Sequence, residues 1–333
     1  MRLHIRRTDD RERRGAAGLL NGARVGSALL LLLGMLAVPT PHARAATDAE
    51  LALHWAPVHY QDTDDTDADA DYLSAVDYDG NWNTLDNWEH QDDDVRRLVG
   101  TAYYSVVETS THWFIVYAYY HPRDWCDTFG CQALDQHHEN DMEGIMLTVR
   151  KSGGMGTLEA MVTVAHNDFR SYVPAGSPLR NGQEDIDGQI RTVNEGGNGA
   201  RPTTFQEAKG HGMYAWDGGG FPGGDGVIYH PAATGGVPAN GNDRSVNYRL
   251  VNIFAGGGLW ARRDNAETFA SNGAFRGDDG ADNAAHAAWG WDDHDDGGQL
   301  LGGELATDPA KLMAIYFSNL GNFSRTYTRN GYR

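Results

Sequence analysis

The sequence predicts an all-β protein, folded as a two-sheet β-sandwich with long acidic and glycine-rich loops. Short segments rich in Val, Ile, Tyr and Phe recur along the chain, and turns rich in Gly, Asn and Asp separate them. Helical periodicity is scarce, and the chain's 42 glycines are concentrated after Gly153. These three observations favour a sandwich whose sheets are joined by long functional loops.

The first 45 residues have the three parts of a secretory signal peptide. An arginine-rich start precedes an apolar run from Val25 to Val38, and the small-x-small sequence Ala43-Arg44-Ala45 follows. The apolar run is shorter than the roughly 20 residues that a membrane-spanning helix needs. We therefore predict a signal peptide over residues 1–45, cleaved near Ala45. The product is expected to be secreted, extracellular or periplasmic, without a transmembrane anchor.

Residues 46–333 are expected to form a single β-sandwich domain, because no repeat and no linker rich in Pro and Ser divides them. Trp113–Tyr120 is apolar on both faces, as expected of a central strand. One short C-terminal helix is expected at Asp308–Ala314, where Asp308-Pro309 is typical of a helix start. The expected strands are Ala102–Glu108, Trp113–Tyr120, Gly144–Val149, Leu158–Ala165, Val246–Phe254 and Met313–Phe317.

The chain is strongly acidic, with a net charge of −19. The basic leader contributes positive charge, so residues 46–333 are more acidic still. Such a surface repels phosphate backbones, which makes nucleic acid an unsuitable partner. It favours cations, and Asp-rich loops offer the oxygen ligands that Ca²⁺ and Mg²⁺ prefer.

The two cysteines, Cys126 and Cys131, lie close together in the sequence. In an oxidising compartment they are expected to form a local disulfide that fixes the loop between them. A zinc site is disfavoured because there is no second cysteine pair.

The segment His137–Glu143, followed at once by a strand, is the strongest candidate site. If Asp141–Val149 is extended, Asp141 and Glu143 point to the same face, because side chains alternate along a strand. His138 can fold back to join them. One imidazole and two carboxylates suit Mg²⁺, Mn²⁺ or Ca²⁺; the same set suits a general base with a carboxylate that orients it. A solvated acidic strand entrance is the alternative.

Three other segments have weaker signals. The acidic run 62–71 lacks the Gly and Glu of an EF-hand loop, so a solvated loop is expected. The acidic run 292–296 follows Trp289 and Trp291, a combination that suits sugars or a sandwich core. Gly218–Gly224 is expected to be a mobile loop.

Residues 110–220 resemble a superfamily that joins the necrosis- and ethylene-inducing-peptide-like toxins to the vacuolar protein sorting-associated proteins of the sixty-two type. The resemblance rests on an aromatic strand, a corner, a His/Asp/Glu motif and two later segments. These are Trp113–Tyr120, His121-Pro122-Arg123-Asp124, His138-Glu-Asn-Asp141-Met-Glu143, Val162–His166 and Ala208–Tyr214. The chain departs from the toxin pattern at Asn140, at Met142 and in a longer loop after Asp124.

This resemblance implies a β-sandwich that holds one divalent cation, Ca²⁺ or Mg²⁺ with Mn²⁺ as a further candidate. The implied ligands are Asp124, His138, Asp141 and Glu143.

Three functions remain open. The first is a secreted, metal-dependent binder or cytolysin acting on an extracellular glycolipid, a polysaccharide or another polar surface. The second is a metal-dependent hydrolase of an extracellular ester or glycan, with His138, His166 or His211 as acid or base. The third is a structural role, in which the bound ion only holds loops together.

Overall fold

The computed structural model describes residues 46–127, 137–195, 197 and 199–333. Contacts group the chain from Ala45 to Arg333 into one compact unit. The predicted signal peptide and Cys131 lie outside the described residues, so cleavage near Ala45 and the pairing of Cys126 with Cys131 stay predictions.

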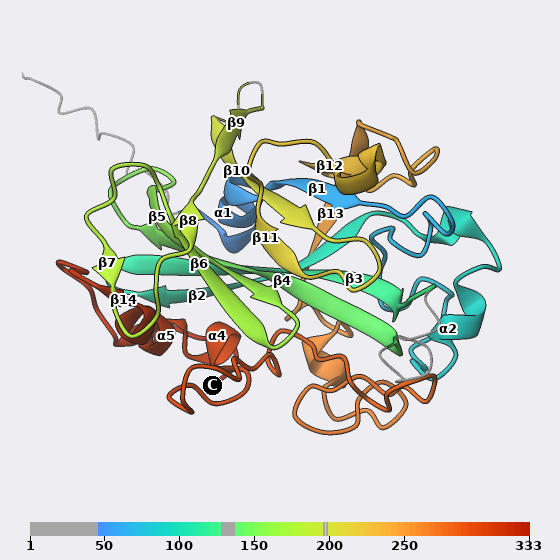
Figure 1. Cartoon of the computed structure of the whole chain (residues 1–333). Coiled ribbons are helices and arrows are strands. Elements are labelled where there is room, and N and C mark those ends of the chain that lie inside the picture. Colours follow the sequence, from blue (N-terminus) through green and yellow to red (C-terminus); the bar gives the residue numbers. More distant parts are fainter. Residues whose placement is uncertain (1–45, 128–136, 196, 198) are drawn as a thin grey trace, which may run out of the picture. The chain divides into compact units, whose positions relative to one another are not determined.

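The predicted two-sheet sandwich is wrong, because one mixed sheet contains most of the strands (Figure 1). It is strongly curled, like half a barrel, and its edge strand β11 comes back towards β5. Its hydrogen-bonded order is β11 (Met213–Ala215), β10 (Ala200–Gln206), β1 (Val58–Asp62), β12 (Gly226–Ala232), β13 (Val246–Asn252), β2 (Thr101–Thr109), β3 (His112–Asp124), β4 (His138–Arg150), β5 (Thr157–Ala165), β6 (Asp168–Val173) and β8 (Gly188–Gln189).

Four short strands complete the β-structure of the described residues. β9 (Thr192–Asn194) pairs with β10, and β15 (Tyr327–Arg329) pairs with β2. β7 (Arg180–Asn181) and β14 (Phe317–Ser318) form a separate two-stranded sheet. Parallel pairs, such as β1 with β10 and β13 with β2, occur beside antiparallel hairpins. The sheet is therefore mixed.

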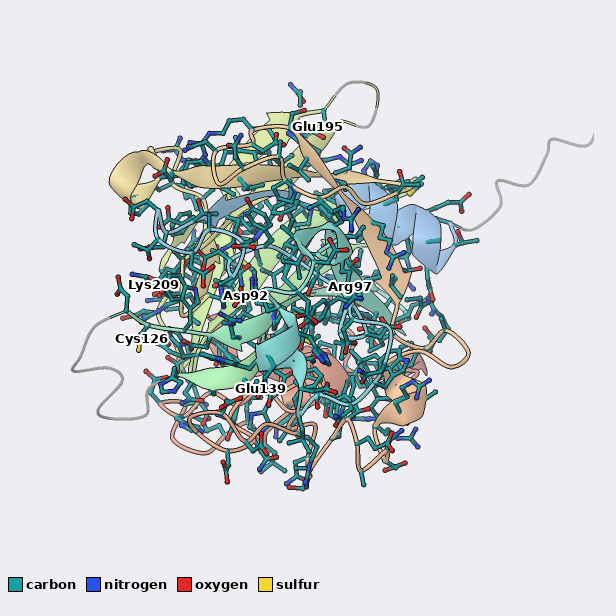
Figure 2. All side chains as sticks on the ribbon, turned by 90° about the vertical axis from the view of Figure 1, so that its right-hand side faces the viewer. Asp92, Arg97, Cys126, Glu139, Glu195 and Lys209 are labelled. Carbon is teal, nitrogen blue, oxygen red and sulfur yellow. The ribbon has the colours of Figure 1, made fainter. Side chains whose placement is uncertain are left out.

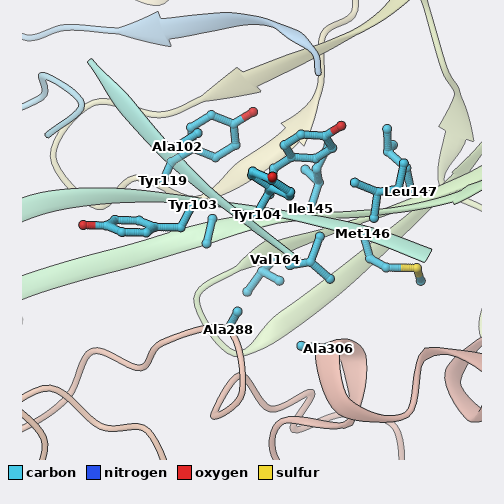
Figure 3. Close-up of a cluster of buried hydrophobic side chains, with 14 of the residues drawn as sticks. Ala102, Tyr103, Tyr104, Tyr119, Ile145, Met146, Leu147, Val164, Ala288 and Ala306 are labelled. Carbon is cyan, nitrogen blue, oxygen red and sulfur yellow. The ribbon is translucent and has the colours of Figure 1, made fainter. Parts of the chain in front are cut away.

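The hairpin β3–β4 is the centre of the sheet, and its strands are buried over nearly their whole length. Both faces are covered, which explains why the β3 sequence is continuously apolar. The Tyr117 hydroxyl of β3 donates a 2.7 Å hydrogen bond to the carbonyl of Ala52 in helix α1 (Asp48–Trp55). Figure 3 shows the buried cluster around these strands, with Ala288 and Ala306 contributed from the C-terminal part of the chain.

The remaining helices are short: α2 (Asn87–His90), α4 (Glu304–Thr307) and α5 (Pro309–Tyr316). The helix expected at Asp308–Ala314 corresponds to α5, but the strand expected at Met313–Phe317 is wrong. Leu312, Met313 and Tyr316 are buried at helical spacing, and the chain becomes extended only at Phe317.

Among the described residues, no helix is long and apolar enough to cross a membrane.

Candidate metal and ligand site

The end of the β3–β4 hairpin where β3 finishes at Asp124 and β4 begins at His138 brings the four predicted ligands together. In the strand register, His138 lies opposite Asp124, Asp141 opposite His121, and Glu143 opposite Tyr119. Asp141 and Glu143 are two residues apart in one strand and so point to one face. Asp124 and His138 reach the same place because the hairpin pairs them directly.

Asn140 gives β4 the local bend that precedes Asp141. Its φ of 61° is in the left-handed region, which Asn tolerates better than most residues. Its side chain is fully engaged: the amide nitrogen donates to the carbonyls of Thr84 (2.9 Å) and Arg276 (2.8 Å). The amide oxygen accepts hydrogen bonds from Tyr120 and Asn87. Asn140 therefore fixes the strand entrance and does not face a ligand.

The four residues line a cleft of about 1130 Å³, together with His166. The opposite wall comes from the C-terminal part of the chain and contains two tryptophans, two histidines and an aspartate. These are His286, Trp289, Trp291, Asp292 and His294. Lys209 and Cys126, labelled in Figure 2, lie at another part of its lining. The cleft is therefore acidic at the hairpin and aromatic on the facing wall.

Trp291 packs directly beside the acidic residues. Its indole nitrogen donates a 2.7 Å hydrogen bond to the carbonyl of Met142. Gly144 leaves room for the ring, because a Cβ at this position would lie 2.5 Å from Trp291 Cη2 and 2.2 Å from the carbonyl oxygen of Tyr117. The facing wall is thus held against β4 by a contact that requires glycine.

Two of the three carboxylates, Asp124 and Glu143, have a raised pKa. Burial and the charge of Asp141 raise the pKa of Asp124 to about 8. The same two causes, in the same order, raise the pKa of Glu143 well above its usual range. Glu143 Oε1 accepts a 2.8 Å hydrogen bond from the His166 amide, but its buried Oε2 has no partner. A bound cation would relieve this repulsion and give Oε2 a partner.

His138 has the orientation of a metal-binding imidazole. Its Nδ1 donates a 2.8 Å hydrogen bond to the carbonyl of Asn140. This leaves Nε2, 3.4 Å from Asp124 Oδ2, as the nitrogen that can bind an ion. Metal-binding histidines commonly have this arrangement, with the second nitrogen fixed by a carbonyl or carboxylate.

His211 lies behind Asp141 and has no exposed surface. Its Nδ1 lies 3.0 Å from Asp141 Oδ2, and its Nε2 lies 3.3 Å from Asp71 Oδ1. Burial alone lowers the pKa of His211, but the hydrogen bonds to Asp141 and Asp71 outweigh burial and raise the pKa to about 9. His211 is therefore a buried cation between two carboxylates.

His121 stacks on His211, with ring centroids 3.7 Å apart and planes within 5°. Burial and the charge of His211 lower the pKa of His121 well below its usual value. The pair is thus one charged and one neutral ring.

His166 is the most accessible of the three predicted acid–base histidines, since 51% of its side chain is exposed. Its backbone φ is 58°, in the left-handed region. Its Nδ1 lies 3.9 Å from Glu143, and its Nε2 lies 3.9 Å from Glu207. It lies at the mouth of the cleft between two carboxylates.

The sequence interpretation missed Asp71, which belongs to the acidic run expected to be solvated. Asp71 is fully buried and also accepts hydrogen bonds from the Trp125 indole (3.1 Å) and the Lys209 amide (2.7 Å). The expectation of a solvated loop is wrong for this residue. The run gives no signal that separates Asp71 from its neighbours, because its role depends on His211, far away in the sequence.

The acidic run 292–296 divides between two roles. Asp292 and His294 line the cleft. Asp293 is buried and accepts hydrogen bonds from the Tyr316 hydroxyl and the Phe169 amide, while Asp296 accepts from the amides of Gly298 and Leu300. Only the first pair lines the cleft.

Tighter acidic clusters occur elsewhere among the described residues. In four groups, three donor atoms lie within 4.8 Å of one another: Asp79, Asp86 and His90; Asp67, Asp69 and Asp92; Glu89, Glu139 and Asp279; and Asp168, Asp293 and Asp295. The predicted four are not among these groups. The protein thus has acidic clusters that can hold a metal ion, and the cleft set is more open than these four.

No family model and no curated protein matches the sequence. Solved structures with a distantly similar fold include one described as "Toxin fold for microbial attack and plant defense". That match has a TM-score of 0.32 and 17% identity, and it covers 50% of this chain and 66% of the other.

Two further matches have a TM-score of 0.30. Necrosis and Ethylene inducing Protein 2, from the causal agent of cocoa's Witches Broom disease, is 15% identical, and the match covers 61% of this chain and 74% of that one. NLPPya in complex with mannosamine is 14% identical, with 51% and 68% covered. The chain therefore has a distant structural similarity to the necrosis- and ethylene-inducing toxin fold, which its sequence motifs also resemble.

Proposed function

We propose that the protein is a secreted divalent-metal-binding protein that attaches to an extracellular glycolipid or polysaccharide. Asp124, His138, Asp141 and Glu143 would bind the ion. One observation carries the proposal: Glu143 Oε2 is buried without a partner beside two further carboxylates of the same cleft. An uncompensated group of this kind is costly, and a cation offsets the cost.

The donor set suits a hard cation. Three carboxylates and one imidazole match the preferences of Ca²⁺, Mg²⁺ and Mn²⁺. When bound, the ion supplies positive charge that attracts hydroxyl or other oxygen atoms of a ligand. His211 would keep Asp141 oriented towards the cleft, which makes it a positioning residue rather than an acid or base at the ligand.

The facing wall suits a sugar. Trp289 is half-buried, so part of its ring is available in the cleft, and Asp292 and His294 provide hydrogen-bonding groups beside it. An aromatic ring with polar neighbours is a common environment for polar ligands with apolar faces. The cleft volume of about 1130 Å³ has room for more than a single ion.

A metal-dependent hydrolase is the second candidate, and the position of His166 favours it. The exposed imidazole lies at the cleft mouth, 3.9 Å from Glu143 and from Glu207. An imidazole is the side chain that most often serves as a general acid or base. In this alternative His166 would be the acid or base, and an ion held by Asp124, His138, Asp141 and Glu143 would supply the charge that polarises the scissile group.

Binding and turnover can be measured together on the secreted protein. Liposomes carrying a glycosylated sphingolipid and a panel of soluble polysaccharides are incubated with the protein in about 1 mM Ca²⁺, enough for a weak extracellular site, or in excess EDTA. The proposal expects calcium-dependent attachment without release of reducing sugar or acid. Metal-dependent product release that Asp141→Ala and His166→Ala both abolish would establish the hydrolase instead.

Attachment that persists in EDTA would overturn both functions. Asp264→Ala is the matched control, because the Asp264 side chain is 85% exposed and lies outside the cleft lining. It removes one carboxylate, as Asp141→Ala does, and should leave attachment unchanged.

A further inference from the structure

A second pocket of about 340 Å³ lies on the edge hairpin β10–β11. Its lining includes three aromatic residues and two carboxylates. We call it the aromatic pocket. The residues that line it include Phe205, Glu207, Tyr214, Trp216, Asp217 and Pro222.

Strand register places these side chains on one face. Phe205 lies directly opposite Tyr214, and Glu207, just after the end of β10, lines the pocket beside them. Cross-strand aromatic pairs of this kind form a continuous apolar surface. Phe205, Glu207 and Tyr214 are all half-buried, so the surface is open to a ligand.

The rings below this surface are held in place. Trp216 stacks on Tyr60, with centroids 4.4 Å apart and planes within 7°. The ring centroids of Phe221 and Trp216 are 5.6 Å apart, and the Arg244 guanidinium carbon lies 4.3 Å from the ring centroid of Phe221. The glycine-rich segment 218–224, expected to be a mobile loop, thus supplies a packed wall to the aromatic pocket.

The aromatic pocket adjoins the cleft. Glu207 lines the pocket, His166 lines the cleft, and Glu207 Oε2 lies 3.9 Å from His166 Nε2. A ligand longer than one sugar can therefore reach from one site to the other past His166 and Glu207.

We infer that the aromatic pocket binds a second unit of an oligosaccharide that carries amino groups, while the cleft holds a neighbouring unit. This inference rests on the proposed function. The apolar faces of a pyranose ring pack on Phe205 and Tyr214 as they do on other aromatic surfaces. The carboxylates of Glu207 and Asp217 complement a protonated amino group.

The test compares glucosamine with its β-1,4-linked tetramer by isothermal titration calorimetry in excess Ca²⁺. Wild-type protein should bind the tetramer more than tenfold more tightly than the monomer. Phe205→Leu should weaken tetramer binding about two- to tenfold, as expected for one lost aromatic contact. Glu207→Gln should weaken tetramer binding more at low salt than at high salt, because salt screens the carboxylate's charge.

Phe323→Leu is the matched control, because Phe323 is half-buried like Phe205, packs on His112 and Phe114, and lines neither site. Circular dichroism and thermal unfolding verify that each variant is folded. Equal affinity of wild type for monomer and tetramer, or equal tetramer affinity of wild type and Phe205→Leu, would overturn the inference.

Asp141→Ala separates this inference from the function on which it rests. If Asp141→Ala leaves tetramer binding intact while Phe205→Leu weakens it, the aromatic pocket is a sugar site and the metal-dependent cleft is not. If wild type binds Ca²⁺ but neither sugar, the inference fails and the metal site stands.

Discussion

His211 holds Asp141 from behind, with its Nδ1 3.0 Å from Asp141 Oδ2. The same ring reaches Asp71 through Nε2, so one buried imidazolium compensates two buried carboxylates. Removing one member of such a group leaves an uncompensated buried charge, which is more costly than the loss of an ordinary hydrogen bond.

His211→Phe should therefore destabilise the protein by roughly 3–5 kcal/mol, although Phe can still stack on His121. Urea unfolding measures this change. His230→Phe is the control, because the His230–Glu195 pair is partly exposed, and its loss should cost about 1 kcal/mol or less. Similar losses for the two variants would mean that the buried pair has no special role.

Arg201 closes the C-terminal end of α1. Its buried guanidinium donates hydrogen bonds through Nη1 to the carbonyls of Leu53, His54 and Ala56. These carbonyls have no partner within a helix, and a cation also complements the negative end of the helix dipole. Arg201→Met keeps the apolar stem and removes the donors, so it should lower the free energy of unfolding by about 2–4 kcal/mol.

The comparison variant for this prediction is Arg263→Met, whose arginine is partly exposed and pairs with the exposed Asp264. Arg263→Met should lower the free energy of unfolding by about 1 kcal/mol or less, as expected for the loss of one surface ion pair. Chemical unfolding of both variants decides the matter, and an Arg201→Met protein as stable as wild type would refute this account of α1.

Asp62 predicts a specific pH dependence. Burial and the charge of Asp71 raise the pKa of Asp62 to about 7, and its Oδ1 is buried without a partner. The folded pKa exceeds the unfolded value of about 4. The protonated Asp62 carboxyl therefore contributes its full stabilisation below about pH 4. This contribution is lost as the pH rises through about 7.

Asp62→Asn resembles the protonated form at every pH. Its free energy of unfolding, measured with urea in EDTA, should equal that of wild type near pH 4 and exceed it near pH 8 by on the order of 1–2 kcal/mol. Asp264→Asn should show no such pH-dependent difference. A constant offset between wild type and Asp62→Asn across this range would contradict the assignment.

The sequence predicted the part of the site that depends on local pattern. The apolar run Trp113–Tyr120 and the alternation at Asp141 and Glu143 identify a strand and its face without any knowledge of the fold. The number of sheets was not predictable in this way. It depends on pairings such as β1 with β10, which join short strands far apart in the sequence.

The same limitation applies to the residues around the ligand set. Asp71 reaches the site from a distant segment, and nothing in its local sequence distinguishes it from solvated carboxylates. Trp289 was recognisable as a residue for a sugar or for the core, but its place in the cleft lining depends on the fold. Met313–Phe317 shows the opposite error. Its apolar, β-branched and aromatic residues suit a strand, but tertiary packing buries Leu312, Met313 and Tyr316 along one side of a helix.

The central claim is that one divalent ion binds between Asp124, His138, Asp141 and Glu143. Calorimetric titration of Ca²⁺, Mg²⁺ and Mn²⁺ into wild type, Asp141→Ala and Asp264→Ala tests it most directly. Wild type and Asp264→Ala should bind one ion with equal affinity, and Asp141→Ala should lose at least tenfold in affinity, about 1.4 kcal/mol. Equal titrations for wild type and Asp141→Ala would contradict the claim, because the ion would then bind elsewhere on the acidic surface.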